Sequence, residues 1–169
     1  MPQQFTIKKL TGLCSIQDLG RFTAQHLGFS AGGASDEYAF LSANKLLNNP
    51  NNSAALEISF AHLTLQIETT CTIAITGADC QTQLNGQAIK HWQVHHLSAG
   101  DILELFAPKS GLHSYLAIYN GINSALWLGS RSVTLTEQAL DFSGKQLTNG
   151  DTIPLHTICH NPQIAFPPA

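Results

Sequence analysis

Apolar and polar residues alternate over short stretches along most of this chain, which is the pattern of β-strands with one buried face. The first stretch is residues 5–10, and residues 14–17 continue it after the turn residues Thr11 and Gly12. Asn85-Gly86 predicts a two-residue hairpin between two later stretches. The further predicted strands are residues 54–59, 63–67, 71–76, 81–84, 87–89, 92–97, 102–106, 113–119 and 152–155. Many short strands at close spacing predict a β-barrel or a β-sandwich.

One segment has the period of a helix instead. Ser35 or Asp36 can cap its first turn, and the asparagines and proline of residues 48–52 end it. The apolar stripe between these signals consists of Tyr38, Leu41, Ala43, Leu46 and Leu47. The sequence therefore predicts a mainly β fold with one principal helix.

The length of 169 residues fits one domain, which we assign to residues 1–160. Residues 161–169 contain three prolines and are predicted to be a tail or linker. Only 11% of the residues are charged, so we expect a partner to cover part of the surface.

Composition also excludes several classes of function. The net charge of −3 and the absence of basic runs argue against binding to nucleic acid or to an anionic membrane. No apolar run is long enough to span a bilayer, and the start of the chain lacks the pattern of a signal peptide. The four cysteines have no C-x-x-C spacing, so a reduced cytoplasmic protein is the simplest interpretation.

Residues 15–36 form the most site-like segment, because they combine four glycines with several polar and charged groups. Asp18 and Arg21 are close enough in a turn to pair, and an arginine suits a carboxylate or phosphate. Gly32 and Gly33 precede the helix start, where free amide groups can receive an anion. The alternative is a structural Asp–Arg pair that braces a long loop, and the residues alone leave both interpretations open.

Three other candidates are weaker. Arg131 lies among glycine and serine residues and suggests a second anion contact, although an exposed arginine in a turn is the simpler interpretation. Residues 76–79, Thr-Gly-Ala-Asp, close an apolar strand and indicate either a pocket or an ordinary turn. Glu57 lies within an apolar strand and is expected to face solvent, unless it is buried with a partner that makes it a candidate acid or base.

Metal and nucleotide motifs give no further candidate. His91 and His95 would share one face of a strand, but no neighbouring ligands complete a zinc site, so we predict no metal. The chain has no Walker-type loop, no G-x-S-x-G elbow and no dinucleotide fingerprint.

A longer series of motifs carries a resemblance to a known family. The sequence reads SIQDLGR at residues 15–21, GGASDEYA at residues 32–39 and ANKLLNNPNNSAALEI at residues 43–58. TGAD, AGD, SG, YLAIYNGI and LGSRS follow in order up to residue 132. In these motifs the chain resembles the allophanate hydrolase subunit 2, or biotin-dependent carboxyltransferase-like, family. Its bacterial members include one of the subunits of 5-oxoprolinase and a KipA-type antagonist of a kinase inhibitor.

The resemblance implies a fold, a partner set and an activity. The family's lobes are similar to a cyclophilin-like β-barrel with a helix, and its members are about twice as long, so the chain resembles the first of two lobes. The implied activity is ATP-dependent opening of 5-oxoproline to glutamate, in a complex with a KipI-like subunit and a LamB/YcsF-like subunit. ATP would be bound at the level of the complex, and the isolated lobe would be inactive.

Two alternatives remain within the same resemblance. The chain would be a non-catalytic module that antagonises a KipI-like kinase inhibitor, or a carboxyltransferase domain of a urea carboxylase and allophanate hydrolase system. Only the second alternative requires biotin.

The resemblance also implies which residues form the site. Gln17, Asp18 and Arg21 are expected to contact the substrate, and Arg131 is expected to be a further anion contact. The residues expected to shape the pocket are Ser30, Gly32, Gly33 and Asp36.

Overall fold

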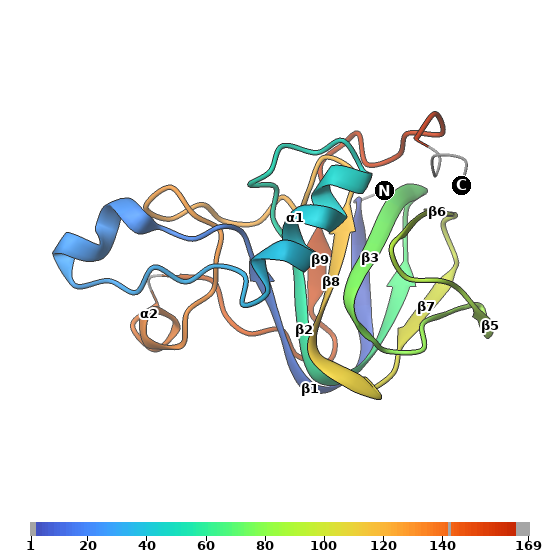
Figure 1. Ribbon diagram of the computed structural model, residues 1–169, viewed down its shortest axis with the longest axis horizontal. Helices are drawn as coiled ribbons and strands as arrows, with labels where there is room; N and C mark the ends of the chain where they lie inside the picture. Colours follow the sequence, from blue (N-terminus) through green and yellow to red (C-terminus); the bar gives the residue numbers. More distant parts are fainter. Residues whose placement is uncertain (1–2, 142, 165–169) are drawn as a thin grey trace.

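Nine strands form a single sheet in the structure, a computed structural model in which residues 3–141 and 143–164 are described (Figure 1). All of its strand pairs are antiparallel. The strands are β1 (Gln4–Gln17), β2 (Ala55–Ile67), β3 (Cys71–Asp79), β4 (Gln83–Leu84), β5 (Gln87–Ala88), β6 (Gln93–Leu97), β7 (Ile102–Leu105), β8 (Ser110–Ile118) and β9 (Thr152–Pro154).

The long strand β2 organises the sheet. One of its edges pairs with β1, while its other edge pairs first with β8 and then with β7. The sheet therefore divides into two branches that run β8-β3-β6 and β7-β4-β5, and β9 extends the outer edge of β1. The result is a curled half-barrel, and the prediction of a mainly β fold is confirmed.

Two pairs of predicted strands are each one continuous strand. Residues 5–10 and 14–17 both belong to β1. Residues 55–59 and 63–67 both belong to β2, which begins one residue after the predicted start. The predicted turn at Gly12 is a bend within β1. Gly12 has a φ of 97° and Phe60 of β2 has a φ of 48°, and the pairing register shifts at this place. A Cβ at Gly12 would overlap the carbonyl of Phe60 and lie 2.8 Å from the Cα of Ala61. Glycine is therefore required where the two strands bend together.

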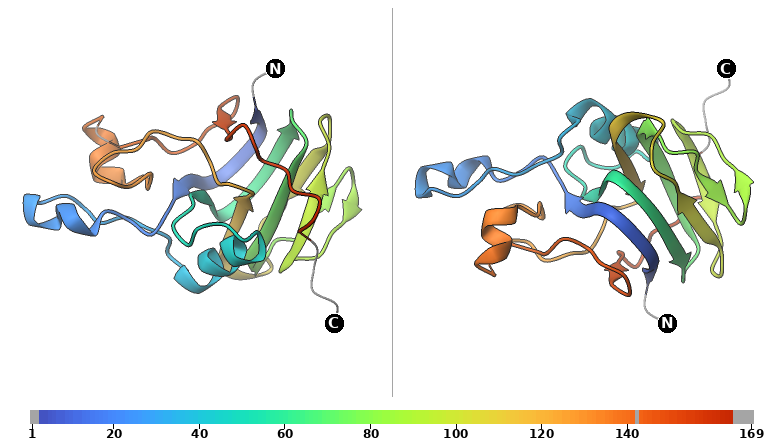
Figure 2. Two further views of the ribbon diagram at one scale, coloured as in Figure 1. Left: turned by 90° about the horizontal axis from the view of Figure 1, so that it is seen from above. Right: turned by 90° about the horizontal axis from the view of Figure 1, so that it is seen from below.

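The core has two parts, one inside the curled sheet and one under the helix α1 (Glu37–Leu46), which covers the other face of β3 and β8 (Figure 2). The inner part includes Phe5, Ile7, Leu56, Leu63, Leu65, Ile73, Ile75, Leu103, Leu116 and Ile118. The helix is confirmed, but its buried face differs from the predicted stripe. Phe40 and Asn44 are buried, whereas Tyr38 is exposed. Asn44 is accommodated because its amide donates to the carbonyl of Ser53 and accepts from Asn49.

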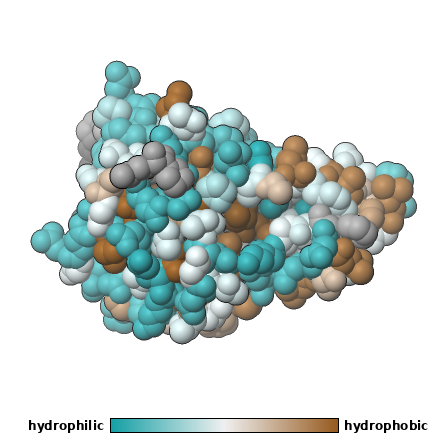
Figure 3. All heavy atoms as spheres, turned by 180° about the vertical axis from the view of Figure 1, so that it is seen from behind, coloured by the Kyte–Doolittle hydropathy of each residue, from teal (hydrophilic) through white to brown (hydrophobic). Residues whose placement is uncertain are grey.

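An arm, defined here as residues 19–34, 123–141 and 143–145, projects from the sheet (Figures 1 and 2). It contains a 3-10 helix (Phe22–Leu27) and the short helix α2 (Leu135–Ala139), neither of which the apolar pattern predicts. Apolar side chains gather on its surface (Figure 3). The exposed large apolar residues of the arm are Phe22, Leu27, Leu126, Leu128, Leu135 and Leu140.

The last described residues of the chain contact the sheet. Residues 161–164 belong to the predicted tail, and the amide of Asn161 donates to the hydroxyl of Thr72 in β3. Ile164 is buried, while residues 165–169 lie outside the described part of the chain. Within the described part, no helix is long and apolar enough to cross a membrane.

Candidate functional site

Asp18 joins the two segments of the arm at its base. Its Oδ1 accepts from the hydroxyls of Ser130 and Ser132 at 2.6 and 2.7 Å and from the amide of Gly20 at 2.8 Å. Its Oδ2 accepts from the amide of Arg131 at 2.7 Å. Burial acts to raise the pKa of this carboxyl, but the hydrogen bonds outweigh burial and hold the pKa below its ordinary value. Asp18 is therefore a buried anion whose partners all lie in its own chain.

Arg21 is buried beside this carboxylate but does not pair with it. Its side chain is 2% exposed, and its Nη2 donates to the carbonyl of Ser132. The guanidinium carbon lies 4.9 Å from the ring centre of Trp127, which is a cation–π geometry. The two ion pairs found among the described residues involve other acids, so the predicted Asp18–Arg21 pair does not form. Arg21 braces the arm through carbonyl oxygens and an aromatic face.

Glu137 is a third buried charge at this junction, and the sequence analysis missed it. Its Oε1 accepts from the amide of Ser30 at 2.6 Å, and its Oε2 accepts from the hydroxyl of Thr134. Burial acts to raise its pKa, but these hydrogen bonds hold the pKa below its ordinary value. Glu137 and Asp18 both act to raise the pKa of Arg21, although the burial of Arg21 outweighs them and lowers it. The only sequence signal for Glu137 is an acid in an otherwise uncharged stretch.

Gln17, Gly32 and Gly33 lie close to the same junction. The amide nitrogen of Gln17 donates to Ser15 and to the carbonyl of Val133, and its buried Oε1 has no hydrogen-bond partner among the described residues. Gly32 has a φ of 65°, and a Cβ there would lie 2.7 Å from a methyl group of Thr134. A Cβ at Gly33 would lie 2.8 Å from the carbonyl oxygen of Leu19. Gly32 therefore allows the two segments of the arm to approach closely, and Gly33 allows a close approach within the first segment.

Asp36 is held in a separate hydrogen-bonded group at the start of α1. Its Oδ1 caps the helix by accepting from the amide of Ala39 at 3.0 Å. The amide of Asp36 donates to the hydroxyl of Tyr115, which donates in turn to Glu57, at 2.7 Å each. Ser35 also donates to Glu57 through its amide and its hydroxyl. Tyr115 and Glu57 thus hold the start of the helix against the sheet.

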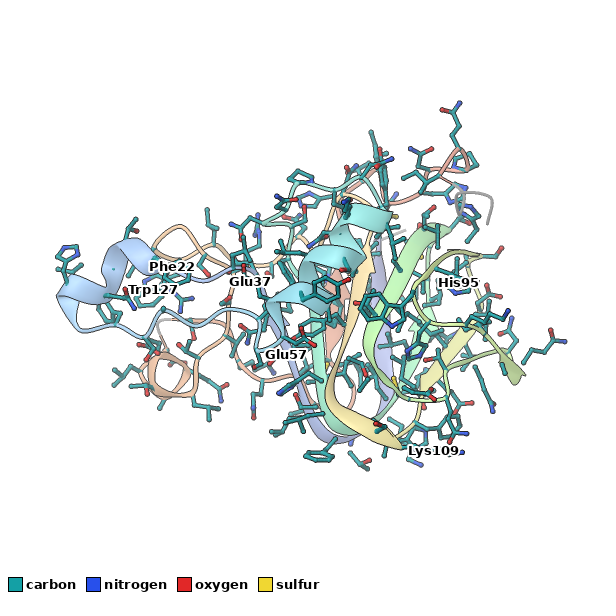
Figure 4. The ribbon with its side chains drawn as sticks, in the orientation of Figure 1. Phe22, Glu37, Glu57, His95, Lys109 and Trp127 are labelled. Carbon is teal, nitrogen blue, oxygen red and sulfur yellow. The ribbon has the colours of Figure 1, made fainter. Side chains whose placement is uncertain are left out.

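The burial of Glu57 differs from what the sequence led us to expect. The residue was expected to face solvent, but it is 9% exposed and lies near the start of α1 (Figure 4). It can be buried because Tyr115 and Ser35 supply three hydrogen bonds to its carboxylate. Burial and the hydrogen bond to Glu57 raise the pKa of Tyr115, which keeps its hydroxyl a donor.

The side chain of Arg131 is only half-buried, in contrast to the buried side chains of Gln17, Asp18 and Arg21. Its amide binds Asp18, but within the described residues its half-buried guanidinium has no hydrogen bond and no ion pair. Deleting this side chain would leave the hydrogen bonds around Asp18 intact. Arg131 is the cation at the base of the arm that is best placed to meet a ligand or a partner.

His91 and His95 have different hydrogen-bond partners. His91 contacts the hydroxyl of Thr82 at 2.7 Å, and His95 contacts the carbonyl of Lys90 at 2.7 Å. Strand β6 begins only at Gln93, so the alternation that would place both rings on one face does not apply. Within residues 3–141 and 143–164, no group of three or more potential ligands could hold a metal ion.

The structure thus separates the predicted residues into two groups. Gln17, Asp18 and Arg21 are buried at the base of the arm, where Ser30, Gly32, Gly33 and Arg131 also lie. Asp36 caps α1 beside the sheet. The first group connects the two segments of the arm, on which Phe22 and Trp127 lie (Figure 4). Its half-buried guanidinium is that of Arg131.

Comparison with known proteins places this chain in a family. Residues 27–166 match the family described as "Carboxyltransferase domain, subdomain A and B". The chain belongs to this family. It is 37% identical over 142 residues to a 5-oxoprolinase subunit of Escherichia coli (strain K12), covering 83% of this chain and 46% of that protein. The carboxyltransferase-family chain therefore spans about half the length of this relative.

Longer fungal proteins contain a similar region. Urea amidolyase of Saccharomyces cerevisiae is 30% identical over 140 residues, which cover 82% of this chain and 8% of that protein. The crystal structure of the K. lactis urea amidolyase superposes with a TM-score of 0.84 at 29% identity, over 98% of this chain and 10% of that chain. The carboxyltransferase-family fold of this chain is therefore found both in a separate subunit and within large multidomain proteins.

Proposed function

We propose that this chain is the first lobe of a subunit of a 5-oxoprolinase, which opens 5-oxoproline to glutamate with hydrolysis of ATP. The observation that carries the proposal is the 37% identity to the E. coli 5-oxoprolinase subunit over 83% of the chain. The proposed partners are a second lobe, a KipI-like subunit and a LamB/YcsF-like subunit, assembled in the cytoplasm.

The arm supports the proposal of a second lobe. Phe22, Leu126 and Leu135 on its surface are 64%, 63% and 67% exposed. Burial of a large apolar side chain is worth about 1.5–3 kcal/mol, so a surface with several of them favours a covering partner. The E. coli relative has about half of its length beyond the matching region. We assign the apolar surface of the arm to contact with that second lobe.

Within this site we assign substrate contact to Arg131 and positioning to Gln17, Asp18 and Arg21. The guanidinium of Arg131 is accessible and matches the carboxylate of 5-oxoproline. The other three are buried, and they fix the backbone from which Arg131 extends. The sequence has no Walker-type phosphate-binding loop. ATP is therefore assigned to another part of the complex.

The test is 5-oxoproline-dependent ATP hydrolysis by the complex of this chain with its second lobe and the KipI-like and LamB/YcsF-like subunits. We expect Arg131→Ala to lower kcat/KM for 5-oxoproline at least tenfold, because a charged hydrogen bond is worth about 1.5–3 kcal/mol. Lys9→Ala removes an exposed cation from β1 and serves as the control that should keep activity. Unchanged activity of Arg131→Ala in an assembled complex would contradict this assignment.

A second candidate is carboxyl transfer to urea, and the match to urea amidolyase over 82% of the chain favours it. Biotin enters only under this candidate. The polar groups of the arm junction are hydrogen-bonded mainly to one another, so the junction by itself has no open site for the biotin ring system. If the same complex turns over urea with bicarbonate but does not turn over 5-oxoproline, this second candidate would be supported.

A further inference from the structure

A cleft between α1 and the edge where β3 ends and β8 begins is separate from the arm junction. Its volume is about 500 Å³, within the usual range for small-molecule sites. The pairing of Asp79 with Ser110 brings the two strand ends together at this point. The lining residues are Asp36, Tyr38, Gly77, Ala78, Asp79, Trp92, Ser110, Gly111, Leu112 and His113.

Two aromatic rings form one wall of this cleft. The ring centres of Tyr38 and Trp92 lie 6.0 Å apart, at an interplanar angle of 38°. Tyr38 is 75% exposed and Trp92 is 38% exposed, so neither ring is used to fill the core. Trp92 has a φ of 60°, which is rare for a bulky residue. Solvent-exposed aromatic faces of this kind attract cations.

The charges that line the cleft are negative. Asp36 uses one carboxylate oxygen to cap α1, and Asp79 uses one to accept from the amide of Gln81. Neither takes part in an ion pair among the described residues, so each has one oxygen available. No lysine or arginine is among the lining residues.

Several other titratable groups lie near the cleft. His91 interacts electrostatically with Asp79, and Lys45 lines a neighbouring hollow together with Tyr38 and Trp92. Lys109 donates to the carbonyl of Asp79 through its backbone amide, and its ammonium forms no ion pair with a described residue. The Nδ1 of His113 is directed to the hydroxyl of Ser59 at 2.7 Å. The cleft therefore combines aromatic faces with two carboxylates that lack a cationic partner.

We propose that this cleft binds an alkylguanidinium group, either as a free small molecule or as the arginine side chain of a partner protein. A guanidinium is planar and weakly hydrated, so it can stack on Tyr38 or Trp92 while its N–H groups donate to a carboxylate. An ammonium ion is more strongly hydrated and matches the planar faces less well. This site goes beyond the proposed 5-oxoprolinase function and does not depend on it.

The experiment is a titration of the purified chain with n-butylguanidinium, followed by the NMR signal of the Trp92 indole N–H. The signal is assigned by its loss in Trp92→Phe. We expect saturable shifts, and at least tenfold weaker shifts with the neutral isostere N-butylurea, because a neutral group lacks the attraction to carboxylates and π faces. Equal binding of N-butylurea would overturn the claim that the site selects a cation.

Variants locate the site within the cleft. Asp79→Asn and Trp92→Leu are each expected to weaken binding of n-butylguanidinium about three- to thirtyfold. Asp36→Ser tests the other carboxylate while it keeps a helix-capping side chain, so loss of binding there does not reflect loss of α1. Asp141→Asn removes the same charge from the exposed arm and should leave affinity unchanged. Wild-type affinity in the folded Asp79, Asp36 and Trp92 variants would overturn the proposal.

A final pair of titrations distinguishes the two sources of the ligand. Free arginine carries a carboxylate that the two aspartates repel, whereas a blocked arginine amide resembles an arginine within a protein chain. Tighter binding of the blocked amide assigns the cleft to a partner's side chain, and tighter binding of free arginine assigns it to a small molecule. Binding of neither compound would contradict both.

Discussion

At the scale of single residues, buried charged side chains and their hydrogen bonds hold the arm to the sheet. Asp18 receives four hydrogen bonds, and Arg21 lies against the ring of Trp127. A buried charge that loses its partners costs several kcal/mol, so these contacts specify one arrangement of the two arm segments. The motifs around residues 15–21 and 128–132 thus act as one structural unit.

We expect Asp18→Asn to lower the free energy of unfolding by about 2–3 kcal/mol, because the amide nitrogen would face groups that are themselves donors. Chemical denaturation of the variant and the wild type measures this difference. Asp141→Asn, at an exposed position of the arm, should change it by less than about 0.5 kcal/mol. A loss no larger than that of the control would show that Asp18 does not brace the arm.

The same carboxylate predicts a pH dependence. Its pKa is lower in the folded chain than its ordinary value, so its stabilisation is present above about pH 3.9 and is lost as the pH falls toward the folded pKa. The difference in stability between wild type and Asp18→Asn should therefore shrink below about pH 4. Denaturation curves between pH 3 and pH 7 measure this difference. A stability difference that grew as the pH fell would contradict the prediction.

At this scale the sequence drew attention to residues that lie at the arm junction, but it did not predict their contacts. It identified Asp18, Arg21 and Arg131 but expected an Asp18–Arg21 pair, because local spacing in a turn was the only available guide. The actual partners of Asp18 include Ser130 and Ser132, which are more than a hundred residues away in the chain. Contacts at that separation depend on the fold and have no local pattern.

At the scale of elements, the strands and the main helix were largely predictable, and the bends and short helices were not. The type and approximate position of α1 follow from its cap and its stop signal. Glycine at residue 12 signals a turn in sequence, but it forms a bulge here, because β2 bends at the same place through Phe60. The 3-10 helix and α2 are too short to show a helical period.

The bend at Gly12 predicts a large effect of one methyl group. Gly12→Ala would place a Cβ against the backbone of Phe60 and Ala61, so we expect a loss of about 3 kcal/mol or more in unfolding free energy. Gly86→Ala is a matched control, because Gly86 also has a positive φ but nothing lies within 4 Å of its Cβ position. The control should lose only about 1–2 kcal/mol, and equal losses would contradict the close approach at the bend.

At the scale of the whole molecule, the chain has a well-formed core and an arm whose apolar surface is uncovered (Figure 3). The arm and its apolar surface were not predictable from alternation, because they depend on where two distant segments meet. The low content of charged residues was the sequence sign from which we expected a partner to cover part of the surface.

We expect the chain to bind its second lobe through the arm. Phe22→Ser with Leu135→Ser should weaken this association at least tenfold, since each change removes about 1.5–3 kcal/mol of apolar burial. Ultracentrifugation of the mixed lobes measures the association. Phe60→Ser, at an exposed position of β2, is the control that should leave the association unchanged. Equal affinity of the arm variant and the control would place the interface elsewhere.

The central claim is tested most directly by measuring the glutamate formed from 5-oxoproline and ATP by the assembled complex, with and without this chain. The account predicts that glutamate forms in step with ATP hydrolysis and that both stop when this chain is left out. An assembled complex that makes no glutamate, or that makes it equally fast without this chain, would contradict the assignment.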